Sequence, residues 1–509
     1  MSHSPTKPTM RSLWLDSHDP HRIRTAELPA DPSFDVVVAG AGLTGLATAL
    51  MLAHQGLQVA VLEARSVGAV ATGNTTAKLS LLQGTVLSQI RSQHGPGVTR
   101  AYVEASRDGQ SWLLDFCRAH DVPVQHRPAT TYATTKSGLS SVHSELEAAQ
   151  EAGLDARFEG GLELPFEVAG AAVLEDQAQF DPMDVLSALA AEFVLLGGSL
   201  VEGVRVTSVP RRGPFTLETT AGQVRAGKLV LATGVPFTER GGYSVRMQAR
   251  RSYALTFEVG DGFRPYGMHI SADDPVRTLR SVPHDGRELL LVGGNDHVTG
   301  RTSSTAQQVL DLERWTEQHV PGARRTHAWA AQDYRPAGHL PLIGPLPGSD
   351  STAYVGTGYS KWGMTGAVAA ALAISGLEAG QAPAWLEPLD GARPGVKSLG
   401  TGAARNASVG AHMASGWARG ELRELPEVEP ADGSGIVGRR GGRPVAQSTI
   451  DGVTCRVSGI CTHLGGVLAW NDAEKSWDCP LHGSRFAPDG QILEGPATRP
   501  LAPVDDEPA

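Results

Sequence analysis

The sequence predicts an α/β protein that carries a second, smaller domain at its C-terminal end. Segments 35–40 and 228–234 have the pattern of buried strands that end in glycine, which favours α/β structure. Two short boxes of Cys and His, at 461–463 and 479–482, indicate the smaller domain. At 509 residues the chain is long enough for two or three domains with full cores.

Composition narrows the class of partner and compartment. The chain is 41% hydrophobic and 19% charged, and its net charge of −10 argues against nucleic acid or an anionic membrane as partner. It contains no run of the ~20 apolar residues that a membrane span needs, and no apolar core behind an N-terminal basic stretch. Four Cys do not form a disulfide framework. We therefore expect a soluble cytoplasmic protein with no membrane span.

The glycines at 40–45 predict a dinucleotide site. A buried strand runs into Gly40-Ala-Gly42-Leu-Thr-Gly45, and a helical stretch follows. Gly40 would make the turn, Gly42 would let the backbone approach a pyrophosphate, and Gly45 would let helix and strand pack closely. A second strand ends at Glu63, whose carboxylate can bind a ribose hydroxyl. This order of elements favours a nucleotide site over a merely structural glycine turn.

A later strand favours FAD as the dinucleotide. Segment 228–234 ends in Ala-Thr-Gly234 and resembles the strand that packs back near FAD in flavoproteins with two dinucleotide folds. A plain strand-to-turn junction is the alternative. Only one complete glycine fingerprint is present, so a separate NADPH domain is not evident.

Four residues near the C-terminus form a pattern typical of a Rieske [2Fe–2S] centre. Cys461 and His463 form a Cys-x-His box, and Cys479 and His482 form a Cys-x-x-His box after a gap of fifteen residues. Each box mixes one thiolate with one imidazole, which suits a cluster whose two irons take two Cys and two His. The alternative is structural zinc, but its familiar spacings pair Cys with Cys and His with His. A one-electron centre fused to a large upstream domain predicts electron transfer.

Three further segments carry a resemblance to a known family. They are Gly-Asn-Thr-Thr-Ala-Lys-Leu-Ser at 73–80, Gln-Asp-Tyr-Arg-Pro-Ala-Gly-His-Leu-Pro-Leu-Ile-Gly at 332–344, and Gly-Thr-Gly-Tyr-Ser-Lys-Trp-Gly-Met-Thr-Gly at 356–366. With 40–45 they resemble the glycine oxidase/D-amino-acid oxidase family of FAD-dependent oxidoreductases, and more narrowly its branch with a C-terminal Rieske domain. The resemblance covers almost the whole chain.

The resemblance implies an α/β fold in which an FAD domain of the two-dinucleotide-binding type is interleaved with a sheet-rich substrate domain, followed by an all-β Rieske domain. The implied boundaries are an oxidoreductase at 34–390 (FAD-binding parts at about 34–80, 175–250 and 335–390, substrate-domain parts at about 81–174 and 251–334), a linker at 391–431 and the Rieske domain at 432–504.

The resemblance also implies roles by position. Thr75, Thr76 and Lys78 would lie beside the flavin or its phosphates. The flavin edge would be wrapped by Gly358, Tyr359, Lys361, Trp362, Gly363 and Met364. Core packing is the alternative for Trp362 and Met364, and tight turning for the glycines. Segments 68–80 and 356–366 contain no His or Cys, so we expect FAD to be bound non-covalently.

The catalytic candidates are Lys361, Arg335 and Tyr253. Arg335 falls where glycine-oxidase-like enzymes place a carboxylate-binding Arg, and a guanidinium can clamp a carboxylate bidentately. A surface or domain-contact role is the alternative. Tyr253 and His297 are candidate pocket residues that could equally be structural. We name no catalytic base, because a flavin can take hydride from a neutral amine.

The cluster boxes differ from those of respiratory-type Rieske proteins, which have two further Cys joined by a disulfide. Gly466 and Leu481 hold those positions here. Ser484 keeps the place of a hydroxyl that can hydrogen-bond a cluster sulfide. We expect the imidazoles of His463 and His482 to stay partly exposed and to give electrons an exit.

The function expected from these features is FAD-dependent oxidation of an amine or amino acid at a C–N bond. Electrons would then pass through the Rieske cluster to an external protein or quinone acceptor. One alternative is a reductase in which electrons flow inward from the cluster to the flavin. Another is a redox sensor or electron carrier without catalysis. The identity of the substrate, the electron partner and the oligomeric state stay open.

Overall fold

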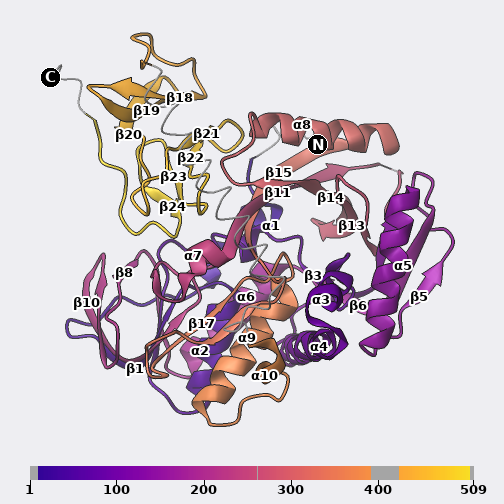
Figure 1. Ribbon diagram of the computed structural model, residues 1–509, viewed down its shortest axis with the longest axis horizontal. Helices are drawn as coiled ribbons and strands as arrows, with labels where there is room; N and C mark the ends of the chain where they lie inside the picture. Colours follow the sequence, from indigo (N-terminus) through magenta and orange to yellow (C-terminus); the bar gives the residue numbers. More distant parts are fainter. Residues whose placement is uncertain (1–9, 261, 391–423, 505–509) are drawn as a thin grey trace.

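The computed structural model describes residues 10–260, 262–390 and 424–504. Residues 391–423, most of the expected linker, lie outside the described residues. Figure 1 shows the C-terminal strands β18–β24 stacked on one side of a larger α/β body. We call residues 10–390 the flavoprotein part and residues 424–504 the Rieske part. The described helices include none that is long and apolar enough to cross a membrane.

A mainly parallel eight-stranded sheet carries the predicted nucleotide turn. Its strand order is β16-β17-β10-β1-β2-β7, and β8 and β9 extend it beside β10. The central strands are buried on both faces, as parallel strands covered by helices usually are. The strands are β1 (Ser33–Ala39), β2 (Val59–Leu62), β7 (Ser199–Val201), β8 (Val206–Ser208), β9 (Phe215–Thr219), β10 (Gly222–Leu231), β16 (Leu342–Pro345) and β17 (Ala353–Thr357).

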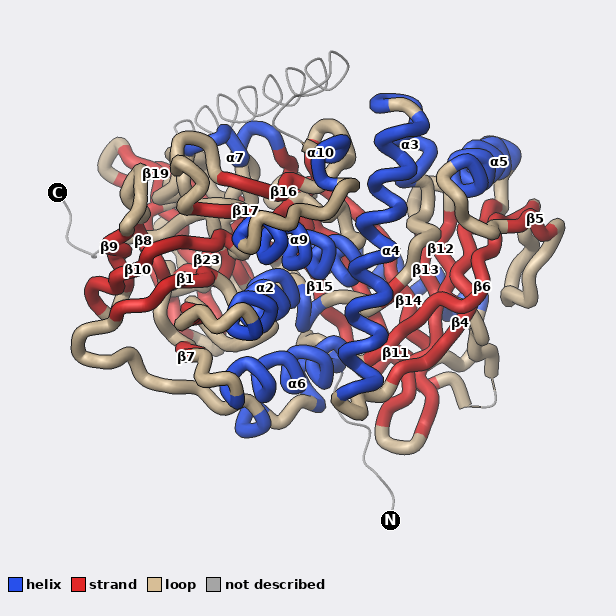
Figure 2. Tube along the Cα trace, turned by 90° about the horizontal axis from the view of Figure 1, so that it is seen from below, coloured by secondary structure: helices blue, strands red, loops and turns tan. Residues whose placement is uncertain are grey.

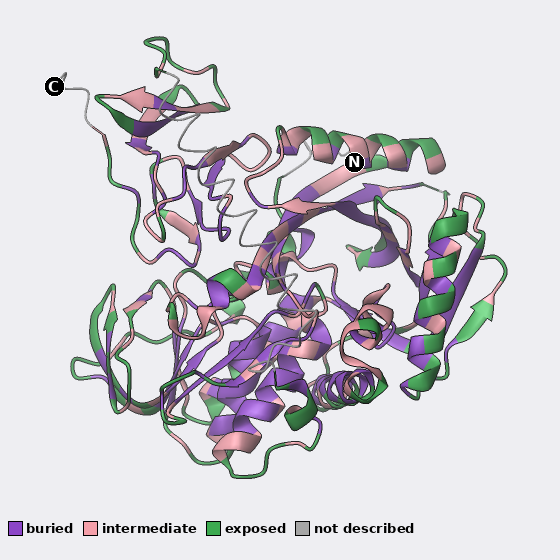
Figure 3. Cartoon of the chain, in the orientation of Figure 1, coloured by how far each residue is buried: buried purple, intermediate pink, exposed green. Residues whose placement is uncertain are grey.

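Three helices pack together beside this sheet. They are α2 (Leu43–His54), α6 (Pro182–Leu195) and α9 (Gly363–Glu378). The helices α2 and α9 lie side by side, as Figure 2 shows. Both are rich in Ala and Gly, and small side chains let helices approach closely. Figure 3 shows the buried residues concentrated in this sheet and these helices.

A second sheet of nine strands lies beside the first. Its order is β15-β11-β14-β13-β12-β4-β6-β3, and β5 pairs with β6. The strands are β3 (Lys78–Leu79), β4 (Val124–Ala133), β5 (Arg157–Glu159), β6 (Gly170–Phe180), β11 (Met247–Glu258), β12 (Met268–Ser271), β13 (Arg277–His284), β14 (Arg287–Val298) and β15 (Arg324–Pro336).

The remaining helices pack around these sheets or in the connections between them. They are α1 (Leu13–Ser17), α3 (Val86–His94), α4 (Pro96–Ala119), α5 (Lys136–Glu151), α7 (Tyr243–Arg246), α8 (Thr305–His319) and α10 (Leu386–Leu389), with 3-10 helices η1 (Pro20–Arg22), η2 (Thr72–Asn74) and η3 (Arg240–Gly242). The strand segments of the two sheets alternate along the chain, so neither sheet is formed from one continuous stretch.

The Rieske part consists of two small antiparallel sheets. The first is β18 (Ser434–Arg440), β19 (Arg443–Ile450) and β20 (Val453–Ser458), and the second is β21 (Ala469–Asn471), β22 (Ser476–Asp478), β23 (Arg485–Phe486) and β24 (Ile492–Glu494). Its core contains the fully buried Trp477 and Phe486, packed with Cys461 and Cys479. The predicted fold class, a mixed α/β protein with an all-β C-terminal region, is confirmed.

The two parts meet through buried charges. Arg251 on β11 is 1% exposed and pairs with Glu474 at 2.5 Å and Glu494 at 3.4 Å, both from the Rieske part. Arg485 on β23 pairs with Glu474, Glu494 and Asp478 at 3.0–3.2 Å. Because buried charges are costly unless they are paired, this set requires one particular docking geometry.

A second contact lies where α8 begins. The Asp472 carboxylate accepts hydrogen bonds from the Ser304 hydroxyl and from the backbone N–H groups of Thr305 and Ala306. A carboxylate is favourable at a helix N-terminus, where N–H groups lack partners in the helix. The Rieske part is therefore held both by ion pairs and by a helix cap.

Substitution of Arg485 by Met tests the buried charge set. It should lower the free energy of unfolding of the Rieske part by roughly 3–5 kcal/mol, since it leaves three carboxylates short of a cation. For a small domain this corresponds to a fall of more than about 10 °C in the melting temperature, measured as loss of the cluster absorption on heating. The exposed Arg157, which pairs with Glu159 and Glu175, is the control. Equal melting temperatures for Arg485→Met and Arg157→Met would contradict this.

Candidate flavin and cluster sites

A cavity of about 340 Å³ lies at the carboxyl ends of the parallel strands. Residues that follow β1, β2, β10 and β17 line it, and so do residues of β11, β14 and β15 from the second sheet. Nucleotides bind at this end of α/β sheets. The predicted cofactor residues that line it are Gly40, Gly42, Glu63, Thr75, Thr76, Lys78, Gly234, Gly358, Trp362, Gly363 and Met364.

Gly45 does not line the cavity but determines the shape of its turn. A Cβ atom at Gly45 would lie 1.8 Å from the carbonyl oxygen of Gly40, so no side chain fits there. Gly40 itself has φ +107°, a conformation that favours glycine. The tight contact brings the N-terminus of α2 to the cavity, where Gly42, Leu43 and Thr44 line it. A helix N-terminus is suited to a pyrophosphate.

Backbone hydrogen bonds hold Glu63 in place at the end of β2. Its carboxylate accepts hydrogen bonds at 2.8 Å from the backbone N–H groups of Ala41 and Arg65. Burial raises its pKa, and these two hydrogen bonds partly oppose the rise. The glycine turn, the helix N-terminus and a buried acceptor at the end of β2 together fit FAD.

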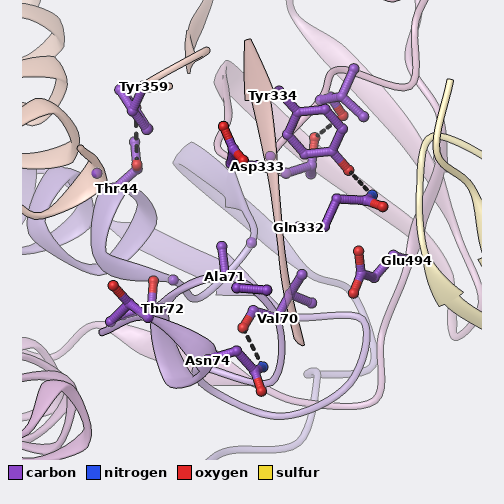
Figure 4. Close-up of a pocket in the computed structure, with 18 of the residues that line it drawn as sticks. Thr44, Val70, Ala71, Thr72, Asn74, Gln332, Asp333, Tyr334, Tyr359 and Glu494 are labelled. Atoms are coloured by element: carbon purple, nitrogen blue, oxygen red, sulfur yellow. Dashed lines mark hydrogen bonds between the residues drawn. The ribbon is translucent and has the colours of Figure 1, made fainter. Parts of the chain in front are cut away.

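Hydrogen bonds hold the loops around the cavity (Figure 4). The Thr44 and Tyr359 hydroxyls lie 3.0 Å apart and join α2 to the loop before α9. The Asn74 amide donates to the Val70 carbonyl at 2.6 Å. Lys78 donates to the Thr76 hydroxyl, and burial, with Arg280 and Lys361 nearby, lowers the pKa of Lys78 to about 7.

The catalytic candidates Lys361 and Arg335 meet at Asp296, which sequence reasoning missed. Lys361 Nζ lies 2.9 Å from Asp296, Arg250 Nε 2.6 Å and Arg335 Nη2 3.6 Å. Lys361 and Asp296 line the cavity, whereas Arg335 contacts Asp296 from outside the lining. Burial disfavours the charged form of Asp296 and so raises its pKa, but the three cations outweigh this and hold the pKa below its ordinary value.

Two further residues lie beside this group. Asp333 lines the cavity, and both of its carboxyl oxygens are buried without a hydrogen-bond partner among the described residues. This burial raises its pKa. Tyr253 lines the cavity too, and its hydroxyl lies 3.4 Å from His297 Nε2. Burial raises the pKa of Tyr253 well above its ordinary value.

The four predicted cluster ligands come together in two pairs, Cys beside Cys and His beside His. The Cys461 and Cys479 thiols lie close enough to interact, and each thiol shifts the other's pKa, down for Cys461 and up for Cys479. The rings of His463 and His482 lie with centroids 5.2 Å apart at 89°. Two thiols on one side and two imidazoles on the other fit a two-iron cluster with two Cys on one iron and two His on the other. The described residues hold no group of three or more His, Cys, Asp or Glu arranged for a single metal ion.

Gly466 and Leu481, which replace the two further Cys, are in contact. A Cβ at Gly466 would lie 2.8 Å from the Leu481 side chain and 2.9 Å from the Cys479 sulfur. Leu481 therefore packs where a disulfide would lie in the resembling proteins. The Ser484 hydroxyl helps to lower the pKa of Cys461 and accepts a hydrogen bond from the Ala497 N–H at 3.0 Å.

The expectation that both imidazoles stay partly exposed is wrong for His482. The His463 side chain is 8% exposed and His482 is buried. His463 Nε2 lies 2.7 Å from the Glu239 carboxylate of the flavoprotein part. Arg301, also from the flavoprotein part, donates to the Pro480 carbonyl at 3.0 Å. The flavoprotein part therefore covers the histidine side of the cluster site.

The cluster site and the cavity share a wall. Gln332 lines the cavity, and its amide donates at 2.9 Å to the Tyr334 hydroxyl. The same amide donates at 2.9 Å to the carbonyl of Gly483, the residue that follows the second cluster box. Gly483 has φ +81°, and a Cβ there would lie 2.4 Å from the Ala249 side chain on β11. Residues 493–498 of the Rieske part line the same cavity, and Figure 4 shows Glu494 at its edge.

The residues missed from the sequence had weak signals. Asp296 adjoins His297, and Gln332 and Asp333 open the segment 332–344 that carried the resemblance. Their acidic and amide side chains within strands were the available signal. Glu239 and Glu494 had none, because their role depends on how the two parts dock.

Comparison with known proteins agrees with this architecture. Residues 35–377 match the family model described as FAD dependent oxidoreductase, and residues 427–505 match the Rieske [2Fe-2S] domain. The chain belongs to the FAD-dependent oxidoreductase family. It carries a Rieske domain, and its cofactors are FAD and a [2Fe–2S] cluster, as predicted.

Relatives match the whole chain or one of its two parts. The Rieske 2Fe-2S iron-sulfur protein YhfW of Bacillus subtilis (strain 168) is 29% identical over 488 residues, 94% of each chain. Gamma-glutamylputrescine oxidoreductase of Escherichia coli (strain K12) is 23% identical and spans 65% of this chain and 80% of its own. The crystal structure of glycine oxidase from Geobacillus kaustophilus has TM-score 0.58 at 18% identity, over 69% of this chain and 96% of its own.

Substitution of Gly45 by Ala should weaken FAD binding about 10- to 100-fold, because the added methyl group displaces the Gly40 turn. Titration of the FAD-free protein with FAD, followed by flavin fluorescence, measures this dissociation constant. Gly97→Ala is the control, since a Cβ at Gly97 meets no atom within 4 Å. Unchanged affinity in Gly45→Ala would mean that the turn does not hold the cofactor.

Proposed function

We propose that this protein oxidises an amine or amino acid at a C–N bond and passes the electrons through its own Rieske cluster to an external acceptor. The wall shared by the cavity and the cluster site, through Gln332, Gly483 and residues 493–498, carries this proposal. When bound, FAD accepts a hydride and the cluster transfers single electrons. The chain brings the two sites together within one molecule.

The charged group at Asp296 supports a substrate that carries a carboxylate. Lys361, Arg250 and Arg335 place three cations around Asp296. A substrate carboxylate could replace Asp296 as partner of Lys361, which lines the cavity. Asp296 would then hold Arg250 and Arg335 in place. This gives Lys361 and Arg335 roles in binding and orientation, not in proton transfer.

Tyr253, Asp333 and the loop 358–364 complete the proposed substrate end. Tyr253 keeps its proton, since burial raises its pKa, and its hydroxyl lies beside His297. Burial also raises the pKa of Asp333, and the nearby Lys361 and Arg335 oppose the rise. Trp362 and Met364 would pack against the flavin from the start of α9.

The names of similar proteins point to the same substrate class. They include a glycine oxidase, an L-proline dehydrogenase and a gamma-glutamylputrescine oxidoreductase, which between them act on amines and amino acids. A cluster at the cavity wall offers a one-electron exit, which favours a dehydrogenase over an oxidase that reduces O₂.

An anaerobic spectral screen tests the proposal. The purified holoprotein is mixed with secondary amines, glycine derivatives, and D- and L-amino acids. We expect bleaching of the flavin band, followed by loss of the oxidised cluster band, with at least one compound. No bleaching with any compound, together with reduction of both centres by NAD(P)H and a ferredoxin reductase, would favour inward flow and contradict the proposal.

The Lys361→Met variant tests the substrate end. With the compound that bleaches the flavin, kcat/KM should fall about 10- to 100-fold, because a charge-assisted hydrogen bond is lost. FAD content should stay that of the wild type. The control is Lys136→Met, which removes an exposed lysine at the start of α5. Equal kcat/KM in the two variants would remove Lys361 from the site.

A further inference from the structure

We propose that Glu239 of the flavoprotein part is a positioning residue for the Rieske cluster. Its carboxylate accepts a hydrogen bond from His463 Nε2, which leaves Nδ1 as the ring nitrogen for iron, and its charge lowers the reduction potential of the cluster. The inference rests on the presence of the cluster. It does not depend on the substrate or on the direction of electron flow.

Glu239 contacts His463 directly, and each of its two carboxylate oxygens has a hydrogen-bond partner. Glu239 Oε1 lies 2.7 Å from His463 Nε2, and Glu239 Oε2 accepts from the Ser244 hydroxyl at 2.9 Å. The Glu239 carbonyl also accepts from the Gly242 N–H, which closes the turn of η3. Ser244 is buried in α7, and α7 packs against β11. The carboxylate is thus anchored to the sheet that lines the flavin cavity.

The chemistry of such a contact is well defined. A metal-bound imidazole that donates its second N–H to a carboxylate has its tautomer and ring orientation fixed, and becomes a stronger donor to the metal. A stronger donor and a nearby negative charge both stabilise the oxidised cluster, which carries the more positive charge. Glu239 should therefore make the cluster harder to reduce.

The two ligand imidazoles have different surroundings. His482 Nε2 is buried and has no hydrogen-bond partner among the described residues. Arg301, a cation, lies near the second cluster box through its bond to the Pro480 carbonyl. Within the described part of the chain, a carboxylate hydrogen-bonds His463 and none hydrogen-bonds His482. The potential should thus respond to Glu239 in particular.

The expected size of the shift in reduction potential follows from how exposed Glu239 and His463 are. The Glu239 side chain is 52% exposed, so solvent screens its charge, while the His463 side chain is 8% exposed. We expect loss of the charge to increase the ratio of reduced to oxidised cluster roughly two- to tenfold at a fixed potential. For a one-electron couple this is a rise of about 20 to 60 mV.

The contact also links docking to redox properties. Glu239 and His463 belong to different parts of the molecule, so the hydrogen bond exists only while the Rieske part is docked.

The test is a reductive titration of the full-length holoprotein, followed by EPR of the reduced cluster. Glu239→Gln keeps an acceptor oxygen and removes the charge, and Glu239→Leu removes both. We expect the potential to rise in both variants, with altered g values in Glu239→Leu. Cluster content is checked by the visible spectrum of the oxidised protein, and Glu239→Gln keeps the test decisive if Glu239→Leu loses its cluster.

Asp472→Asn is the matched control, because Asp472 bridges the same two parts through Ser304 and Thr305 but does not touch a ligand. Its potential should equal that of the wild type. An unchanged potential in Glu239→Gln would overturn the proposal. So would an equal rise in Asp472→Asn, since docking alone would then explain the effect.

Discussion

The buried ion pairs between the flavoprotein and Rieske parts are the constraint on which the rest of the structure depends. Arg251 and Arg485 lie among Glu474, Asp478 and Glu494 with almost no access to solvent. Buried charges are tolerated only when each finds its partners, so a shifted or rotated Rieske part would leave several of them unpaired. The ion pairs therefore determine the position in which the Rieske part docks more than they add to stability.

In this docked position, the flavin cavity and the cluster site share a wall. Gly483, which follows the second cluster box, contacts Gln332 and Ala249. Residues 493–498 line part of the flavin cavity. The histidine ligands face the flavoprotein part, where Glu239 meets His463. The exposed Leu464, beside His463, is the apolar surface closest in sequence to the ligands.

Local patterns were enough for the sequence to predict the fold class, the family and both cofactors, which are confirmed. The glycine turn at 40–45 and the boxes at 461–463 and 479–482 each keep their chemistry within a few residues. Asp296 and Glu239 could not be found in this way, since their partners lie 65 and 224 positions away in Lys361 and His463. The predicted exposure of the His482 imidazole failed for the same reason, because the flavoprotein part covers the histidine side of the cluster site. The roles of Lys361, Arg335 and Tyr253 stay predictions.

The central claim is that flavin and cluster exchange electrons within one chain. The measurement that tests it most directly is the rate of cluster reduction after rapid photoreduction of the flavin, over about a hundredfold range of protein concentration. The account predicts a first-order process with a rate constant independent of concentration. A rate constant that rises in proportion to concentration would show transfer between molecules, and would contradict electron transfer across the shared wall.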